Sequence, residues 1–157
     1  MEFEVDGVLM KAMLDKVVID RHTKTIQIYD YKIVWDNVKF YKEYYLYRRA
    51  DIQAYIYWVA VKSESFEEVI GLNVEDFEFL PPIFITADST NSYPPILYKL
   101  TEDHLTAAFF GFEENGRDYK GIFEILKELS WHQENGRWFE TPDLIKKKGL
   151  VDLKYKF

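Results

Sequence analysis

The sequence of 157 residues contains no cysteine. This absence excludes a disulfide framework, a cysteine-based zinc or iron–sulfur site and a cysteine nucleophile, so any metal has to be held by oxygen or histidine ligands. Long apolar runs are also absent, since none approaches the ~20 residues of a membrane-spanning helix. The N-terminal segment MEFEVDG lacks the basic-then-apolar pattern of a secretory signal. We therefore expect a cytoplasmic protein with no membrane partner.

Positive charge is scarce, because 20 Lys and Arg residues face 27 Asp and Glu residues, for a formal net charge of −7. Domains that bind nucleic acid through bulk electrostatics are usually basic. The balance therefore counts against such binding, while leaving room for a local basic groove. The three histidines, at positions 22, 104 and 132, are scattered and form no H-E-x-x-H motif. The sequence also lacks a G-x-S-x-G motif and a phosphate-binding glycine-rich loop.

Hydrophobic residues make up 48% of the chain and aromatic residues 18%. This content suits one compact core, so we expect a single domain over residues 1–157. The N-terminal part predicts a three-stranded antiparallel meander. Asp6-Gly7 suits a two-residue hairpin turn, after which the second strand should run to about Asp20. Residues 21–24 then form a polar loop before a third strand in IQIYDYK, residues 26–32.

Further along, the pattern alternates between helix and strand. We expect a largely buried helix over residues 45–62, strands over 77–88 and 94–100, and a helix from Thr101 that Gly116 interrupts before it continues in residues 119–133. The Pro81-Pro82 pair should mark a sheet edge or a bulge. A short helix is expected over residues 141–149, between Pro142 and Gly149. The string ENGR occurs at 114–117 and at 134–137, and we interpret the repetition as coincidence.

The meander brings charged residues together. With residues 21–24 as the loop, Ile19 faces Ile26, and four residues further on Asp15 faces Asp30. Two opposed carboxylates repel each other unless a cation or a proton lies between them. An oxygen-preferring ion such as Mg²⁺ or Mn²⁺ fits this position, and Lys32 points the same way. The alternative is an ordinary, partly exposed ion cluster at the end of a sheet.

The predicted helix over residues 45–62 adds polar groups. Arg49, Gln53 and Tyr57 follow one another at a spacing of four residues, which places them on one helical face. Just before them, the segment YKEYYLYRR, residues 41–49, mixes tyrosines with basic residues. It could stack on nucleotide bases, or it could be the start of an amphipathic helix whose tyrosines are half buried.

Together these residues resemble a family, the PD-(D/E)XK nucleases, and within it the RecB-type and exodeoxyribonuclease VIII (RecE)-like branch of phages and bacterial recombination systems. The resemblance is carried by Asp15, by Asp30 and Lys32 in IYDYK, and by Gln53 and Tyr57 in QAYIY. It implies an α/β fold of restriction-endonuclease-like type, in which a mixed sheet with an antiparallel meander at its start is flanked by α-helices.

The resemblance also implies an activity, metal-dependent exonucleolytic hydrolysis of DNA in recombination or repair. Asp15 and Asp30 would bind Mg²⁺ or Mn²⁺ together with the backbone carbonyl of Tyr31, and Lys32 would assist the attacking water. Gln53 and Tyr57 would support the site, and Arg49 would contact a phosphate. The implied partners are DNA, a single-strand annealing protein and further copies of the chain.

The chain departs from relatives of this branch at its start. They commonly carry a helix before the first strand, with a further acidic or histidine ligand, whereas this sequence starts at the strand. Glu4 is a poor substitute, because a turn at Asp6-Gly7 pairs it near Leu9, roughly 20 Å along the strand from Asp15. A catalytically inactive nuclease-like module that binds DNA or a protein partner is therefore the alternative to an enzyme.

Overall fold

The two N-terminal strands form a hairpin of their own. In the computed structural model, which describes residues 1–138 and residue 146, β1 (Glu2–Val5) pairs antiparallel with β2 (Val8–Lys11). The turn at Asp6-Gly7 has φ values of 50° and 79°, the left-handed conformation that this dipeptide tolerates well. The sequence predicted this hairpin correctly.

The predicted continuation of the second strand to Asp20 is wrong. Residues 12–15 belong to no strand, and β3 starts at Lys16. Ala12 is held at the base of the first hairpin, where its N–H donates to the carbonyl of Met1 and its carbonyl accepts from the N-terminal ammonium, both at 3.0 Å. The expected three-stranded meander is therefore two separate hairpins, and the first forms a two-stranded sheet that does not join the main one.

The main sheet has four strands in the order β3-β4-β5-β6. They are β3 (Lys16–Asp20), β4 (Thr25–Val34), β5 (Glu78–Asp88) and β6 (Ile96–Lys99). Since β4 and β5 are parallel and the other two pairs are antiparallel, the predicted mixed sheet and α/β class are confirmed. The predicted loop at 21–24 is also confirmed. The register of β4 against β5 shifts beside Pro81-Pro82, where the sequence predicted an edge or a bulge.

Helices cover one face of this sheet. After β4 come a 3₁₀ turn, η1 (Asn37–Lys39), and a π-helix, η2 (Tyr41–Leu46). Two α-helices follow, α1 (Ala50–Ala60) and α2 (Glu64–Ile70). The expected continuous helix over 45–62 is therefore wrong in its first part. It is interrupted at residues 47–49, where Arg49 has a left-handed φ of 54°.

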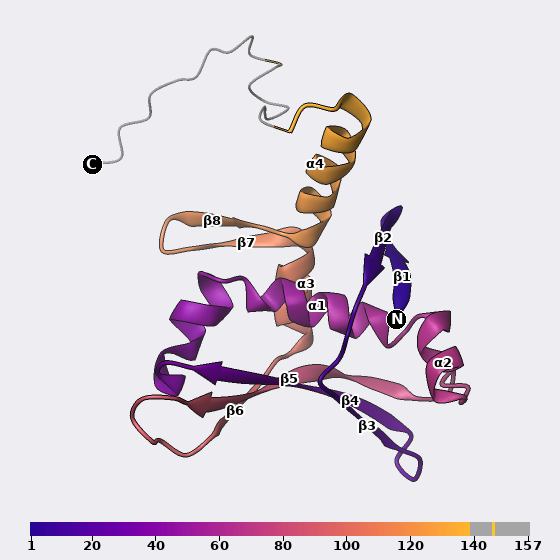
Figure 1. The fold of residues 1–157 in the computed structure, drawn as a ribbon, viewed down its shortest axis with the longest axis vertical. Coiled ribbons are helices and arrows are strands. Elements are labelled where there is room, and N and C mark those ends of the chain that lie inside the picture. The colour runs from indigo at the N-terminus through magenta and orange to yellow at the C-terminus, as the bar shows by residue number, and fades with distance from the viewer. Residues whose placement is uncertain (139–145, 147–157) are drawn as a thin grey trace.

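The two faces of β4 show which side the helices occupy. Ile28 and Val34, on the face toward α1, are 1% exposed, whereas Ile33 on the opposite face is 80% exposed. Figure 1 shows α1 and α3 on the same side of the sheet. No described helix covers the outer face, so the expectation of a sheet flanked by helices holds for one face of the described part.

The C-terminal half contains a hairpin that the sequence pattern did not predict. Helix α3 (Glu102–Phe110) starts at the expected Thr101 cap, but it gives way to β7 (Gly111–Glu114) and β8 (Arg117–Lys120) before α4 (Ile122–Asn135) begins. Gly111 and Gly121 let the backbone pass very closely here, because a Cβ on Gly121 would lie 2.1 Å from the carbonyl oxygen of Phe109. The expected helix is therefore wrong over residues 111–120, while its start at Thr101 and its continuation in α4 are confirmed.

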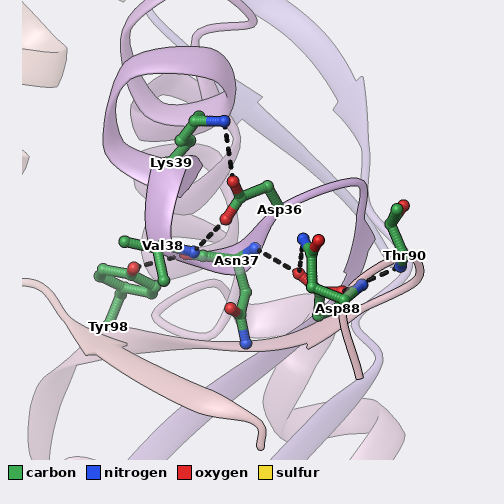
Figure 2. Close-up of polar contacts among 8 residues, drawn as sticks. Asp36, Asn37, Val38, Lys39, Asp88, Thr90 and Tyr98 are labelled. Carbon is green, nitrogen blue, oxygen red and sulfur yellow. Dashed lines mark hydrogen bonds and ion pairs between the residues drawn. The ribbon is translucent and has the colours of Figure 1, made fainter. Parts of the chain in front are cut away.

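Polar contacts connect the segment just after β4 with the last residue of β5 and with β6 (Figure 2). The buried Asn37 donates its N–H to Asp88 at 3.2 Å and its side-chain amide to the carbonyl of Pro94 at 2.9 Å, and its own carbonyl accepts from the Tyr98 hydroxyl at 2.6 Å. Asp36 caps the following turn by accepting from the N–H of Val38 at 3.0 Å. This network holds the strand that carries Asp30 and Lys32 in a fixed position.

Among the residues that the structure describes, no helix has the length and apolar content needed to cross a membrane. The short helix predicted for residues 141–149 lies, apart from residue 146, outside the described part of the chain.

Candidate active site

Asp30 lies at the centre of the sheet with its side chain under α1. It sits on β4 opposite Phe84 of β5 and is only 2% exposed. Lys32, two residues further along the same strand, lies on the same face, because side chains of a strand alternate between its faces. Its Nζ is 2.6 Å from Oδ2 of Asp30. The predicted Asp-x-Lys pair is thus an ion pair in direct contact, with a buried aspartate and a partly exposed lysine.

Asp15 comes from the loop just before β3 and reaches the same place. The pairs of β3 and β4 run from Asp20 with Thr25 to Lys16 with Tyr29, which is the predicted register. Asp15 stands one step beyond the last pair, where its Oδ2 accepts the N–H of Tyr31 at 2.9 Å. Because β3 begins only at Lys16 while β4 continues past Tyr29, the N–H of Tyr31 has no partner in β3 and can donate to a side chain. The structure therefore brings Asp15 and Asp30 together, as the sequence predicted.

The environment of Asp30 disfavours its charged form. Burial raises the pKa of this carboxyl above its ordinary value, and the nearby Asp15 carboxylate adds to the rise, while the Lys32 ammonium acts in the opposite direction. Oδ2 of Asp30 is buried without a hydrogen bond of good geometry, although the Lys32 ammonium touches it. A buried carboxylate oxygen in this state is a suitable ligand for a cation.

Helix α1 supplies a second partner for Lys32. The lysine Nζ donates to Oε1 of Gln53 at 2.8 Å, and Nε2 of Gln53 donates to the hydroxyl of Tyr57 at 2.7 Å. The two α1 residues are one helical turn apart, so their side chains lie side by side. A continuous chain of contacts thus runs from Asp30 through Lys32 and Gln53 to Tyr57, and it holds the ammonium between strand and helix.

Arg49 does not share the helical face of Gln53 and Tyr57, contrary to the sequence prediction. It precedes α1 in the left-handed conformation. Its guanidinium forms two hydrogen bonds with the buried Asp51, at 3.0 and 2.8 Å, and a third with the carbonyl oxygen of Lys120 in β8. The helix begins one residue too late for the predicted spacing to apply, and the side chain instead ties α1 to the second hairpin.

Two acidic residues, Asp15 and Asp30, come together at this site. Within residues 1–138, no group of three or more His, Cys, Asp or Glu side chains is arranged to hold a metal ion. Glu4 pairs with Leu9 in the separate N-terminal sheet, as expected. The donor set of Asp15, Asp30 and the predicted carbonyl of Tyr31 contains only oxygen, which suits Mg²⁺ or Mn²⁺. The Oδ2 atom of Asp30, which contacts the Lys32 ammonium without a hydrogen bond of good geometry, is the feature that fits such an ion.

One surface near the start of α1 was not predicted from the sequence. Arg117, on the unpredicted strand β8, lies against the aromatic segment 41–49, with its guanidinium 5.8 Å from the centre of the Tyr47 ring. The signal for the hairpin was present, because Asn115-Gly116 is a preferred two-residue turn.

Searches against models of protein families, the curated proteins and the solved structures found no match for this chain.

Proposed function

We propose that this chain is a Mg²⁺- or Mn²⁺-dependent deoxyribonuclease with a restriction-endonuclease-like core, which hydrolyses phosphodiester bonds from DNA ends in recombination or repair. The observation that carries the proposal is the buried Asp30 carboxylate. One of its oxygens lacks a hydrogen bond of good geometry, and it lies between a second carboxylate, Asp15, and the Lys32 ammonium.

The metal ion would be held by Asp15 and Asp30, with the carbonyl of Tyr31 as a third ligand. When bound, such an ion polarises a phosphoryl oxygen and lowers the pKa of a coordinated water. Because the raised pKa of Asp30 weakens its charged form in the absence of a cation, ion binding relieves an unfavourable state of the folded protein.

Lys32 contributes a fixed positive charge. Its ammonium is held by Asp30 at 2.6 Å and by Gln53 at 2.8 Å, and Gln53 is in turn held by Tyr57. A charge that is already in place does not have to reorganise during the reaction, so it stabilises developing negative charge on a phosphate more effectively than a mobile lysine. The same ammonium can orient a water molecule for attack.

Degradation of end-labelled linear duplex DNA, in the presence of Mg²⁺ or Mn²⁺, tests the proposal. The parent protein should degrade the linear DNA and leave a closed circle intact, and Asp30→Ala should abolish the activity. Asp76→Ala is the matched control, because Asp76 is an exposed aspartate in a turn before β5, and it should degrade DNA like the parent. Loss of activity in both variants, or activity retained by Asp30→Ala, would refute the assignment of the site.

A catalytically inactive module that binds DNA or a protein partner is the second candidate. The observation that favours it is the small number of acidic ligands, two among the described residues. A thermal shift with Mn²⁺ separates the candidates without relying on activity. An active site predicts a rise in melting temperature that Asp30→Ala removes, whereas an inert module predicts no shift in the parent protein.

A further inference from the structure

A groove lies between the π-helix η2 and the β7–β8 hairpin. It encloses a cavity of about 440 Å³, within the usual size range of ligand sites. The residues of the groove that matter here are Tyr41, Lys42, Tyr47, Asn115, Arg117 and Tyr119; we call it the tyrosine groove. Its two walls come from segments that lie far apart in the sequence.

The groove presents aromatic rings to solvent. Tyr47 is 56% exposed and Tyr41 is 46% exposed. Tyr41 is held in place by stacking on Tyr45, with ring centres 5.3 Å apart, and by its hydroxyl, which donates to Glu114 at 2.8 Å. Within the described part of the chain, the hydroxyl of Tyr47 makes no hydrogen bond. A ring of this size left open to water is available for stacking.

The groove also carries two basic side chains that take part in none of the ion pairs of the described residues. Neither Lys42 nor Arg117 forms an ion pair within 4.0 Å among the described residues. The guanidinium of Arg117 lies over Tyr119 and Tyr47, at 5.2 and 5.8 Å from their ring centres. Glu114, the acidic residue of this lining, is bound by the Tyr41 hydroxyl. The lining therefore carries two cationic side chains against one carboxylate, in a chain whose net charge is −7.

The second wall of the groove is rigidly attached to the helix of the candidate active site. The rings of Phe112 and Tyr119 stack across the hairpin with centres 4.9 Å apart. Arg49 lies near both rings and donates to the backbone of β8, while its other hydrogen bonds reach Asp51 in the first turn of α1. The same helix carries Gln53, which holds Lys32. The groove and the Asp30 site are therefore connected through contacts with α1.

We propose that the tyrosine groove binds single-stranded DNA, with bases stacked on Tyr47 and Tyr41 and with Lys42 and Arg117 contacting the backbone. This inference rests on the proposed nuclease function and names the form of DNA that the protein holds. Exposed aromatic rings with flanking basic side chains are the usual composition of single-strand sites. Duplex DNA fits this composition poorly, because its bases already cover one another's faces.

Binding of a fluorescent oligothymidylate of roughly 12 nucleotides, measured by anisotropy in EDTA so that cleavage cannot occur, tests the inference. Tyr47→Ala should weaken binding about tenfold, which corresponds to the loss of one stacked base. Tyr47→Phe keeps the ring and should bind like the parent. Arg117→Ala should weaken binding and lower the salt dependence by about 0.7 in the log–log slope, the value for one phosphate contact on a single strand.

Matched controls come from exposed residues elsewhere. Tyr93→Ala, in the loop between β5 and β6, and Arg21→Ala, in the loop between β3 and β4, should bind the oligonucleotide like the parent protein. Melting temperatures establish that each variant is folded. If Tyr47→Ala unfolds, Arg117→Ala with its salt slope decides the question alone, because that exposed side chain projects from a hairpin and forms no ion pair with a described residue.

The outcomes separate the groove from the active site. Unchanged affinity in both folded groove variants would overturn the inference, as would tighter binding of duplex than of single-stranded DNA by the parent. Oligonucleotide binding that depends on Tyr47, in a protein that degrades no DNA, would refute the nuclease and support the groove. Cleavage that depends on Asp30, without any oligonucleotide binding in EDTA, would support the nuclease and refute the groove.

Discussion

Among the described residues, the ion pairs of two buried carboxylates, Asp51 and Asp30, differ in how completely they are satisfied. Arg49 and Asp51 form a forked pair with two hydrogen bonds, and the third guanidinium contact goes to a backbone carbonyl. Lys32 and Asp30 touch at 2.6 Å, but Oδ2 of Asp30 has no hydrogen bond of good geometry, and burial raises its pKa. We call the Arg49–Asp51 pair the closed pair, because hydrogen bonds of good geometry join its two groups. We call the Asp30–Lys32 pair the open pair, because Oδ2 of Asp30 lacks such a bond.

The difference shows how a structural ion pair can be distinguished from a candidate catalytic one. Burying charges is costly unless each charged group is matched by partners of good geometry. The Arg49–Asp51 pair meets this condition within the chain itself. The Asp30–Lys32 pair meets it only in part, and a bound cation would supply what is missing. Changes at each pair, and at the helix between them, test this comparison.

The largest effect is expected at the closed pair. Asp51→Ala leaves the Arg49 guanidinium without its carboxylate in a partly buried position, so the free energy of unfolding should fall by about 3 kcal/mol. Urea denaturation measures this quantity. Replacing both partners, with Arg49→Met and Asp51→Leu together, should recover most of the loss, since no unpaired charge then remains. A double variant as unstable as the single one would contradict the interpretation.

A smaller effect is expected at Gln53, the residue of α1 that contacts Lys32 of the Asp30–Lys32 pair. Gln53→Ala removes the second acceptor of Lys32 and the donor to Tyr57, and should lower the free energy of unfolding by about 1–2 kcal/mol. Gln133→Ala, at an exposed position of α4, is the control and should leave stability unchanged. Equal losses in the two variants would show that the contact with Lys32 contributes nothing.

At the open pair itself, stability should change little. Asp30→Asn removes a carboxylate whose raised pKa already marks its charged form as unfavourable in the folded protein. In EDTA at neutral pH, the free energy of unfolding should stay within about 1 kcal/mol of the parent value, because Lys32 is partly exposed and keeps Gln53 as a partner. The same variant should lose the stabilisation by Mn²⁺. A stability loss as large as that of Asp51→Ala would mean that Asp30 has a structural role.

The smallest effect is expected in how pH changes the difference in free energy of unfolding between Asp30→Asn and the parent protein. A raised pKa means that the folded protein binds this proton more tightly than the unfolded chain, so the Asp30 contribution to stability increases as the pH falls through the raised pKa toward about 4. Any stability advantage of Asp30→Asn over the parent in EDTA should therefore shrink on acidification. Denaturation at several pH values measures the gap, and a widening gap would reverse the sign of the argument.

The candidate site was predictable where it depended on short-range strand geometry. A four-residue loop between two strands fixes their register, and this register is enough to place Asp15 beside Asp30. Arg49 was not predictable in the same way. Helical spacing assumed a continuous helix, while the left-handed backbone at Arg49 and its contacts with Asp51 and β8 depend in part on residues far away in the sequence.

The two copies of ENGR show a second limit. At 114–117, Asn115 and Gly116 both have positive φ and form the turn between β7 and β8, whereas at 134–137 Asn135 is the last residue of α4 and Gly136 caps it with a φ of 63°. The same four residues thus end a strand in one place and a helix in the other. The preceding chain decides between them, because a glycine with positive φ suits both a hairpin turn and a helix terminus.

The close approach of Gly111 and Gly121 also has a consequence for how this chain could change over time. A Cβ on Gly121 would lie 2.3 Å from the backbone nitrogen of Gly111, so the chain leaves for the β7–β8 hairpin and returns at nearly the same point. The hairpin is in this sense a side branch of the path from α3 to α4. Its tip at Asn115-Gly116 can vary from one descendant to another, whereas Tyr119, which packs in the core, and Lys120, which Arg49 contacts, have to keep their places.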